Sequence, residues 1–454
     1  MSAHIAILDI GKTNKKLLVF DEDYQLVFEL ADQLAETVDE DGFPCEDIAA
    51  LSLWCKTRIE EILIHPEFNI TAIQFSGYGA SFVHLDKITH IPTLPLYNYL
   101  KPLDRSITDQ FYASYGEPNV LALQTCSPSL GMLNSGLQLY RLKHSRAALF
   151  ATIGAALHLP QYLSFLFTNH PVTEMTSIGC HTMLWNYADH DYHSWVYKEN
   201  LDHLFPAIHS STEVFSIKID QKEINVGIGL HDSSAALIPY LASIQEPFIF
   251  LSTGTWCIAM NPFMKDPLTA YQLRQDTLCY ISYQGQYVKA SRLFLGHEHQ
   301  VQLDRLCVHF GVNPTYIDSI SYDPGYLNYS GLHSDLSHYG SNGLMECGFD
   351  KRYVFEIDDF DTAYHVLIHD LVRLQKRSIL LVQDQHIKSI YVDGGFAKNK
   401  IFMKMLAMAF HELEVYSASA SQASALGAAM SIHGSWNRKE IFPQVIQSTL
   451  IIQS

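Results

Sequence analysis

The chain has 454 residues, of which 48% are hydrophobic and 17% are charged; this length and composition are those of a folded protein with two or three domains, and they exclude intrinsic disorder. Its 30 Lys and Arg against 48 Asp and Glu give a formal net charge of −18, which argues against nucleic acid or an anionic membrane as a partner. Residues 1–4 lead directly into the first apolar run, and no apolar run reaches the roughly 18 residues of a membrane span, so we expect no signal peptide, no membrane partner and a location in the cytoplasm.

The residue types that bind metals or form disulfides are present, but not in the patterns that such sites need. The eight cysteines are scattered without a C-x-x-C pair, so buried free thiols are expected. The segment His297-Glu298-His299 lacks the H-E-x-x-H pattern, and alternate residues of a helix point to different faces. We therefore expect neither a disulfide framework nor a zinc site.

A polar turn near the start of the chain separates two apolar runs. Residues 6–10 and 17–20 are rich in strand-forming residues, and the turn between them carries a glycine, a hydroxyl group and lysines. This pattern predicts a hairpin. Gly11 would let backbone N–H groups approach a phosphate, and Asp9 could hold Mg²⁺ directly or through water. A surface hairpin with solvated lysines explains the same residues, so this stretch alone leaves both interpretations open.

Two later segments repeat the pattern of a strand followed by a polar turn. Residues 248–260 are two apolar runs around a Gly/Thr turn, and residues 389–395 are an apolar run that ends in Asp-Gly-Gly before a helical stretch from Lys400 to about Phe410. Paired glycines let a ligand lie flat on the backbone, although a tight turn alone would also need them. One hairpin opening each half of the chain is what a duplicated ATP-binding architecture would show.

The remaining chain predicts alternating strands and helices. Residues 24–30 form a strand, residues 45–64 a helix with one apolar face, and residues 70–85 a strand that runs into a glycine-punctuated turn. This order predicts a parallel α/β core, which binds ligands beyond the carboxyl ends of its strands. Proline and polar residues at 243–247 predict a junction between the halves, and residues 316–349 are expected to form a long irregular insertion.

Asp232 is the strongest candidate for a catalytic group. It is followed by Ser-Ser-Ala-Ala-Leu, which is first of all the signal of a helix N-terminus capped by a carboxylate. The positive end of the helix dipole keeps such a carboxylate ionised, and an ionised carboxylate can also accept a proton from a substrate. The residues alone are compatible with a cap and with a general base.

In this order, the three strand-and-turn segments and the Asp232 segment resemble the FGGY family of carbohydrate kinases, within the actin-like ATPase superfamily. Residues 159–163 and 425–429 also fit the family, and the resemblance covers nearly the whole chain. It implies an α/β fold of two actin-like (ribonuclease H-like) domains with a cleft between them. We expect an N-terminal sugar-binding domain at 1–245 and a C-terminal ATP-binding domain at 246–454.

The resemblance also implies a reaction and a set of residues. The reaction is transfer of the γ-phosphate of ATP to a sugar hydroxyl, with Asp232 as general base and Mg²⁺ anchored by Asp9. The implied ATP and phosphate contacts are Gly11, Thr13, Asn14, Lys16, Gly254, Thr255, Gly394 and Gly395. The implied sugar contacts are Gly79, Ser81, His231 and Asp232. Lys12 and Lys15 are expected to be exposed.

The identity of the sugar is less well specified. His231 before Asp232, and Trp256 after the second turn, resemble the rhamnulokinase branch, which favours an L-rhamnulose-like ketose phosphorylated on a primary hydroxyl. L-fuculose, xylulose, ribulose and polyols stay open, because Ser81 stands where the family often has an acidic or amide residue. The family's aromatic-x-Asp-x-Arg segment also has only a stretched match, from Tyr97 to Arg105. A pseudokinase and a non-sugar ATPase are the alternatives, and a homodimer is left open.

Overall fold

The computed structural model describes residues 2–219, 222–329, 331–332, 338–339, 345–352, 356–440 and 445–452. The chain forms two compact units, and neither is continuous in sequence. The first unit consists of Met1–Ala242, Cys279–Tyr287 and Ser421–Val445, and the second of Ser243–Leu278, Val288–Ala420 and Ile446–Ser454. The predicted domains, 1–245 and 246–454, stay a prediction. Part of the predicted insertion at 316–349 lies outside the described residues.

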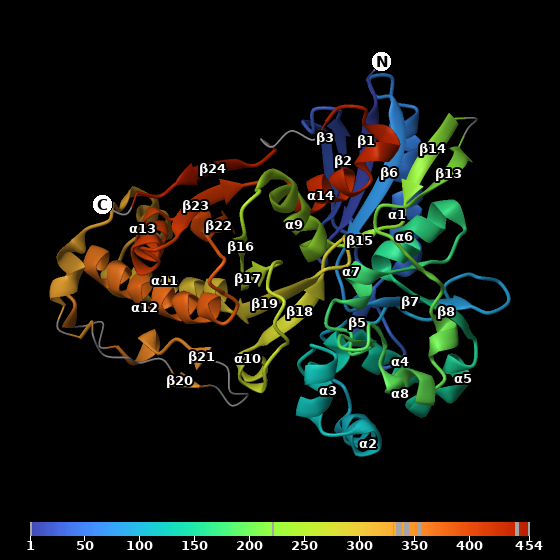
Figure 1. Ribbon diagram of the computed structural model, residues 1–454, viewed down its shortest axis with the longest axis horizontal. Coiled ribbons are helices and arrows are strands. Elements are labelled where there is room, and N and C mark those ends of the chain that lie inside the picture. Colours follow the sequence, from blue (N-terminus) through green and yellow to red (C-terminus); the bar gives the residue numbers. More distant parts are fainter. Residues whose placement is uncertain are drawn as a thin grey trace. The chain divides into compact units, whose positions relative to one another are not determined.

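The first unit is built on a mixed sheet with the strand order β13-β14-β6-β1-β2-β3, with β15 also paired to β6 (Figure 1). Its strands are β1 (His4–Ile10), β2 (Lys15–Asp21), β3 (Leu26–Asp32), β6 (Ile70–Gly77), β13 (Val214–Ile219), β14 (Lys222–Gly227) and β15 (Leu230–His231). Strands β1, β2 and β3 are antiparallel, whereas β6 runs parallel to β1 and to β14. The central strand β1 is almost wholly buried, as expected for a strand covered on both faces.

Three helices pack on the central strands of this sheet. They are α1 (Ile48–Leu63), α6 (Leu159–Thr168) and α14 (Ala423–Ser431). The predicted helix at 45–64 is thus confirmed as α1, which begins after Asp47, whose carboxylate accepts from the N–H groups of Ala49 and Ala50. Helix α14 also crosses α9 (Asp232–Ser243) closely, because a Cβ on Gly427 would lie 1.9 Å from the carbonyl oxygen of Ala235.

The rest of the first unit has a separate apolar core around Phe111, Tyr140 and Trp195. The other helices of the first unit are α2 (Arg105–Tyr115), α3 (Pro118–Gln124), α4 (Ser135–Ser145), α5 (Ala147–Phe150), α7 (Met175–Ile178), α8 (Ser194–Lys198) and α15 (His433–Trp436), of which α15 contacts β6. Its paired strands are β4 (Glu36–Val38) with β5 (Pro44–Glu46), β7 (Phe82–Asp86) with β8 (Ile153–His158), β9 (Thr173–Glu174) with β12 (Ile208–His209), and β10 (Trp185–Asn186) with β11 (Asp191–Tyr192).

The second sheet has the strand order β18-β19-β17-β16-β22-β23-β24, and its strands belong to the second unit except for residues 279–281 of β18 and Tyr287 of β19, which are counted in the first. The strands are β16 (Phe248–Thr253), β17 (Cys257–Asn261), β18 (Thr277–Ile281), β19 (Tyr287–Leu293), β22 (Ser389–Gly394), β23 (Glu414–Ser419) and β24 (Gln447–Leu450). Strand β22 runs parallel to both β16 and β23. Short elements complete the unit: α10 (Ala270–Arg274), β20 (His338–Tyr339) and β21 (Met345–Glu346).

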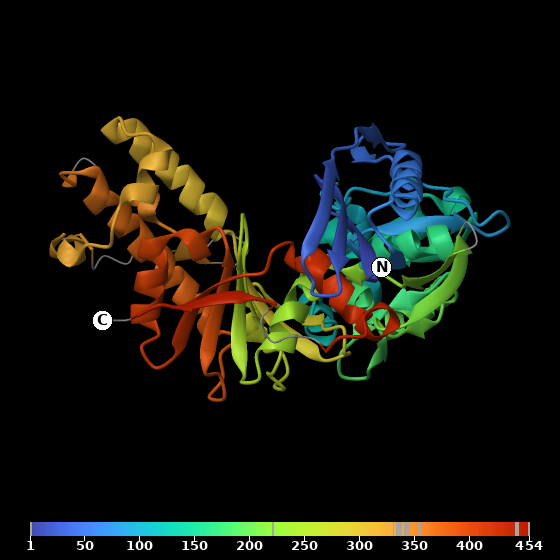
Figure 2. The same ribbon diagram turned by 90° about the horizontal axis from the view of Figure 1, so that it is seen from above.

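Three long helices share one core with this sheet, and Figure 2 shows them gathered beside its strands. They are α11 (Leu295–Phe310), α12 (Phe360–Leu380) and α13 (Lys400–Ala409). Helix α12 contacts both of the others, and it supplies a nearly continuous set of buried residues. The helix predicted from Lys400 to about Phe410 is confirmed as α13.

The two sheets repeat one arrangement. In each, a hairpin (β1–β2 or β16–β17) lies beside a parallel strand (β6 or β22), so the hairpin turn and the carboxyl end of that strand meet at the same edge. The repeated hairpins predicted from the sequence are confirmed. Ligands of α/β proteins bind at such edges, which makes these two the places to look for a site.

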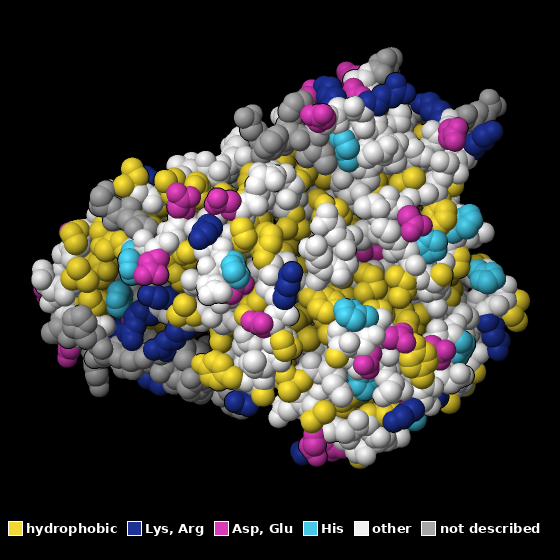
Figure 3. Space-filling model, in the orientation of Figure 1, with side chains coloured by type: hydrophobic (Ala, Val, Ile, Leu, Met, Phe, Trp, Pro, Cys, Tyr) yellow, Lys and Arg dark blue, Asp and Glu magenta, His cyan; other side chains and the backbone are white. Residues whose placement is uncertain are grey.

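The distribution of the described side chains on the surface does not point to a further binding site. On the face drawn in Figure 3, acidic, basic and apolar side chains are interspersed. Among the described residues, no helix is both long and apolar enough to cross a membrane.

Candidate active site

The β1–β2 turn is short and closed by its own backbone. The N–H of Gly11 donates to the carbonyl oxygen of Asn14 over 3.0 Å. The side chains of Thr13 and Asn14 are exposed, and the amide oxygen of Asn14 accepts from Gln33 over 3.0 Å. The turn therefore presents a hydroxyl and an amide group to solvent at the edge of the first sheet.

The lysines of this turn differ from the prediction. Lys15 was expected to be exposed, but it is fully buried, with its Nζ 2.9 Å from Glu46 Oε2. The same ammonium group donates to the carbonyl oxygens of Gly11 and Lys12, over 3.2 and 3.1 Å. The reason is tertiary: a buried carboxylate from β5 supplies the counter-charge, so Lys15 supports the turn from inside. Lys12 is partly exposed and pairs with Glu36 over 2.8 Å.

Asp9 and Lys16 face each other across the β1–β2 ladder, so their side chains share one face of the sheet. Lys16 Nζ lies 2.9 Å from Gln422 Oε1 and 3.2 Å from Glu29 Oε1. Burial and the nearby charge of Asp232 raise the pKa of Asp9 to about 6, and Lys16 opposes that rise. Asp9 and Asp232 are thus neighbours in the first unit.

Asp232 begins α9 at the end of β15. Its Oδ1 accepts from the N–H of Ser233 over 2.6 Å and lies 3.2 Å from Nε2 of His231. One third of the side chain is exposed, yet the surrounding protein desolvates the carboxyl enough to raise its pKa to about 6. A carboxylate with this pKa is a stronger base than an ordinary aspartate and is still ionised near neutral pH.

His231 is buried, and burial lowers its pKa to about 4, so the imidazole is neutral near pH 7. Besides Asp232, its Nε2 approaches Cys180 Sγ at 3.1 Å. Gly79 leaves room for this contact, because a Cβ there would lie 2.4 Å from Cys180 Sγ. Tyr99 is near as well, since burial and then the charges of Asp232 and Cys180 raise the pKa of its hydroxyl. Three predicted sugar contacts, Gly79, His231 and Asp232, therefore come together.

Ser81, the fourth predicted sugar contact, is buried, and its Oγ has no hydrogen-bond partner within the described ranges. It is therefore not a solvated turn residue. Asp104 and Arg105, the residues of the stretched match to the family's Asp-Arg pair, do not join this cluster. Asp104 caps α2 by accepting from the N–H of Ser106 over 2.7 Å, and the side chain of Arg105 is 91% exposed. From that segment, Tyr99 is the residue that lies near Asp232.

The second hairpin turn contacts the start of a helix. Gly254 and Thr255 are exposed, and the N–H of His297, in the first turn of α11, donates to the carbonyl oxygen of Thr255 over 3.2 Å. A Cβ on Gly296 would lie 1.8 Å from the carbonyl oxygen of Gly254. Helix α11 can approach the turn this closely because residue 296 has no side chain.

Thr253 joins this hairpin to the glycine pair. Its hydroxyl donates to the carbonyl oxygen of Asp393 over 2.5 Å and accepts from the N–H of Phe396 over 3.0 Å, while its carbonyl oxygen accepts from Gly395 over 2.8 Å. Gly394 has a φ of +96°, and a Cβ there would lie 1.9 Å from the Thr253 carbonyl oxygen. The sequence therefore carries glycine at position 394 for both conformation and space.

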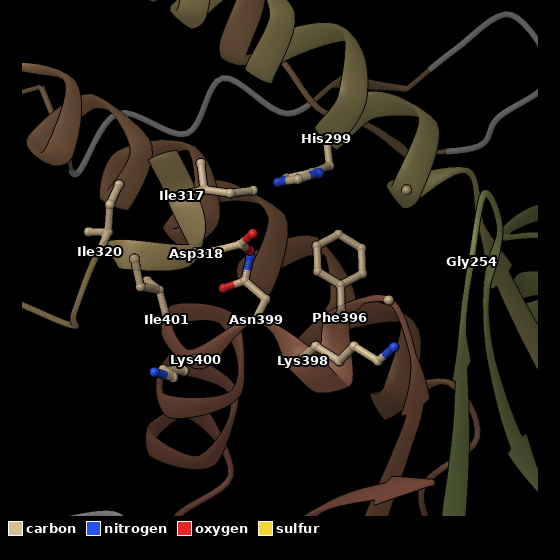
Figure 4. Close-up of a pocket in the computed structure, with 12 residues that line it drawn as sticks. Gly254, His299, Ile317, Asp318, Ile320, Phe396, Lys398, Asn399, Lys400 and Ile401 are labelled. Carbon is tan, nitrogen blue, oxygen red and sulfur yellow. The ribbon is translucent and has the colours of Figure 1, made fainter. Parts of the chain in front are cut away.

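A cavity of about 440 Å³ opens beside these glycines (Figure 4). Figure 4 shows His299, Asp318 and Asn399 directed into the same space from three separate segments. The lining residues are Gly254, Gly296, His299, Ile317, Asp318, Ile320, Gly395, Phe396, Lys398, Asn399, Lys400 and Ile401. Apolar walls with a few polar groups are typical of small-molecule sites of this size. Gly254 and Gly395 were predicted to contact a ligand, and the others were not.

Comparison with known proteins identifies the family. A model of the N-terminal domain of the FGGY family of carbohydrate kinases matches residues 4–238, and a model of the C-terminal domain matches residues 368–432. The chain belongs to the FGGY family of carbohydrate kinases. Enzymes of this family use ATP as the phosphate donor. No curated protein sequence matches this FGGY kinase significantly.

Solved structures show the fold of this kinase. A carbohydrate kinase from Novosphingobium aromaticivorans is 22% identical, covers 99% of this chain and 93% of its own, and has a TM-score of 0.81. A gluconate kinase from Lactobacillus acidophilus is 16% identical with coverages of 99% and 93% and a TM-score of 0.78. A ligand-bound xylulose kinase from the same organism is 16% identical with coverages of 98% and 93% and a TM-score of 0.77. The predicted actin-like α/β fold is confirmed.

Some residues near the site of this kinase were missed in the sequence. Gly296 stands in a segment with no recognisable motif, whereas Thr253 and Asn399 border the predicted Gly/Thr and Asp-Gly-Gly turns without being part of them. Cys180 lies between a glycine and a histidine, in a segment that fits the family but suggests no role. A threonine that ends a strand before a Gly/Thr turn is a usable signal, because its hydroxyl can bind the backbone of the adjacent strand.

Replacing Thr253 with valine should weaken nucleotide binding. The change keeps the side-chain shape but leaves the Asp393 carbonyl and the Phe396 N–H without the hydroxyl. Each hydrogen bond stabilises the binding conformation of the glycine turn by about 1 kcal/mol, so we expect the Kd of a non-hydrolysable ATP analogue, measured by calorimetry, to rise by up to about 30-fold when both are lost.

Thr277→Val is the matched control. The Thr277 hydroxyl is buried in β18 and has no hydrogen-bond partner among the residues that the structure describes, so this variant should bind like the wild type. Equal affinity for all three proteins would show that Thr253 does not hold the glycine turn in its binding conformation.

Proposed function

We propose that this kinase transfers the γ-phosphate of ATP to a primary hydroxyl of a ketose, with an L-rhamnulose-like sugar as the favoured substrate. The supporting observation is the neutral His231, whose Nε2 lies 3.2 Å from Asp232 Oδ1, in a cluster that also holds Gly79 and Tyr99. L-fuculose, xylulose, ribulose and polyols are the other acceptors that the proposal allows.

Asp232 is proposed to act as the general base. As the sugar oxygen attacks the γ-phosphorus, its O–H proton passes to the carboxylate, the new P–O bond forms, and the bond to the β-phosphate oxygen breaks to release ADP. Burial supports this role because it raises the pKa of Asp232 to about 6. Above that pH the group is ionised and also accepts a proton more readily than a solvated aspartate would.

The proposed nucleotide contacts come from the two turns and the glycine pair. Exposed Thr13 and Thr255 offer hydroxyl donors, and Lys16 offers a charge at the same edge of the sheet as Asp9. The cavity beside Gly395 is proposed to take the adenosine. The full proposed set is Gly11, Thr13, Asn14, Lys16, Gly254, Thr255, Gly394 and Gly395. Most of the rate enhancement in such transfers comes from positioning the reactants and from stabilising the charge on the phosphate oxygens.

Mg²⁺ is proposed to bind at Asp9. The residues fit a hard cation, because a desolvated carboxylate with a second carboxylate, Asp232, nearby has a raised pKa that a divalent cation would lower again. Among the described residues, no group of three or more His, Cys, Asp or Glu is arranged around a metal. Mg²⁺ commonly uses one or two carboxylates and completes its shell with phosphate oxygens and water. When bound, it would neutralise charge on the phosphates.

Sugar-dependent ADP production tests the proposed function. We expect Mg²⁺-ATP turnover to rise well above a no-sugar control with one or two ketoses in a panel of ketoses, aldoses and polyols. Binding of ATP without stimulation by any sugar would favour a pseudokinase. High turnover in the absence of sugar would favour a non-sugar ATPase.

Asp232→Asn should strongly reduce phosphoryl transfer without weakening ATP binding. An amide of the same shape cannot accept the proton, so we expect kcat to fall by about 10²–10⁴-fold. The Kd for ATP should change little. Asp109→Asn, at an exposed position of α2, is the control and should keep wild-type kcat. Near-normal turnover of Asp232→Asn would remove the general-base assignment.

The rate should also depend on pH in a defined direction. Because the pKa of Asp232 is raised to about 6, the base is protonated, and so inactive, below that pH. We expect kcat/KM for the sugar to be flat from about pH 7 upward and to fall below pH 6 with a slope that approaches tenfold per pH unit. A profile that stays flat down to pH 4.5, in enzyme shown to remain folded, would contradict this.

A further inference from the structure

Cys180 and His181 form a chain of contacts that ends on the carboxyl of Asp232. Cys180 Sγ lies 3.4 Å from Nε2 of His181 and 3.1 Å from Nε2 of His231. The Nε2 of His231 lies in turn 3.2 Å from Asp232 Oδ1. All four residues are in the first unit, and the proposed reaction gives no task to Cys180 or His181.

The donor and acceptor in each of these hydrogen bonds can be assigned, because one end of the series is a backbone carbonyl. His181 Nδ1 lies 3.1 Å from the carbonyl oxygen of Leu133, which can only accept, so the proton of the His181 ring is on Nδ1. In the neutral ring Nε2 then has a lone pair. The hydrogen bond between this Nε2 and Cys180 must therefore use the S–H of the cysteine as donor.

This assignment determines what His231 does. A thiol that has directed its hydrogen to His181 can only accept from His231, so the His231 proton is on Nε2. That nitrogen is also the one that faces Asp232 Oδ1. Nδ1 then carries no proton, and the hydroxyl of Ser234, 3.5 Å from it, donates its own hydrogen to the carbonyl oxygen of Ile281 over 3.1 Å. The lowered pKa of His231 is consistent with a neutral ring that has this single proton.

The Asp232 carboxyl is held from one side only. Its Oδ1 accepts from the N–H of Ser233 at 2.6 Å and from the Ser233 hydroxyl at 3.3 Å, and it faces the Nε2–H of His231. Within the part of the chain that the structure describes, no hydrogen bond is made by Oδ2. The carboxyl group is thus anchored through Oδ1, which leaves Oδ2 as the oxygen that can meet a substrate hydroxyl.

We propose that Cys180 and His181 are positioning residues that hold His231 in its Nε2–H tautomer and thereby orient Asp232 Oδ2 for proton transfer. The role in the reaction rests on the proposed function, in which Asp232 is the base. The tautomer itself does not depend on that function.

Packing around the chain supports a fixed geometry. Gly79 allows the turn after β6 to lie directly against Cys180 and His231. The backbone N–H of His231 donates to Thr176 Oγ1 over 3.0 Å, and that hydroxyl donates to the buried carboxylate of Glu174 over 2.6 Å. Contacts to both the ring and the backbone of His231 thus limit its movement.

Nuclear magnetic resonance of ¹⁵N-histidine-labelled enzyme tests the tautomer directly. Long-range ¹H–¹⁵N correlations distinguish a protonated ring nitrogen from an unprotonated one, and spectra of His231→Gln and His181→Gln assign the two rings. We expect Nε2–H for His231 and Nδ1–H for His181 in the wild type. An Nδ1–H tautomer at His231 would overturn the proposal.

Kinetics of cysteine variants tests the consequence. Cys180→Ala removes the donor, so we expect its His231 to populate both tautomers and kcat to fall about tenfold, as is usual when a group that orients a reactive residue is lost. KM for Mg²⁺-ATP should stay within twofold. Cys180→Ser keeps a donor and should recover most of kcat and the wild-type tautomer. Cys55→Ala, in the buried face of α1, is the matched control and should leave kcat unchanged.

The outcomes separate this proposal from the proposed function. If Cys180→Ala is folded by thermal melting and keeps both the wild-type tautomer and kcat, the positioning role is wrong even though Asp232 is the base. If Asp232→Asn keeps normal turnover, the base assignment fails, and the His231 tautomer of the wild type still decides the direction of the chain. A loss of kcat in Cys180→Ser equal to that in Cys180→Ala would show that sulfur size, and not hydrogen bonding, matters.

Discussion

Two carboxylates that cannot both be charged at low cost occupy one edge of the first sheet. Asp9 and Asp232 are desolvated and near each other, and the pKa of each is raised to about 6. A protein that keeps such a pair gains reactivity in place of stability, because each group would be more stable paired or solvated. The surrounding structure follows from this constraint: Lys16 lies opposite Asp9, a neutral His231 beside Asp232 avoids an ion pair that would lower its basicity, and the start of α9 supplies the Ser233 N–H.

In the second unit, the main constraint is the close approach of backbone segments to one another. Gly296 and Gly394 are positions where a methyl group would collide with a carbonyl oxygen of the β16–β17 hairpin. Thr253 then fastens the strands at the same place with its hydroxyl and its carbonyl. The result is an exposed turn beside a cavity, built from backbone more than from side chains. Such a site tolerates little change in the glycines and much change elsewhere.

The sequence was informative where the signal is local. Alternating apolar runs and glycine turns were enough to predict both hairpins, α1 and α13, and the family. Contacts between distant residues were not predictable: the partner of Lys15 is 31 positions away, the contact from Cys180 to His231 spans 51, and that from Thr253 to Asp393 spans 140. Burial of a lysine or the role of a single cysteine depends on those partners, and one sequence has no pattern that reveals them.

Helix α14 has a consequence for how the protein is made. It packs on β1, β2 and β6, strands that lie within the first 77 residues, yet it spans Ala423–Ser431. Since a chain emerges from the ribosome N-terminus first, that apolar face has no α14 to cover it until almost the whole protein has been synthesised. Most elements of the second unit are synthesised before α14, but β24 (Gln447–Leu450), an edge strand of its sheet, follows α14 in the chain. Neither unit can therefore complete its packing until almost the whole chain has been synthesised, and the uncovered apolar face of the nascent first unit is a natural binding site for a chaperone.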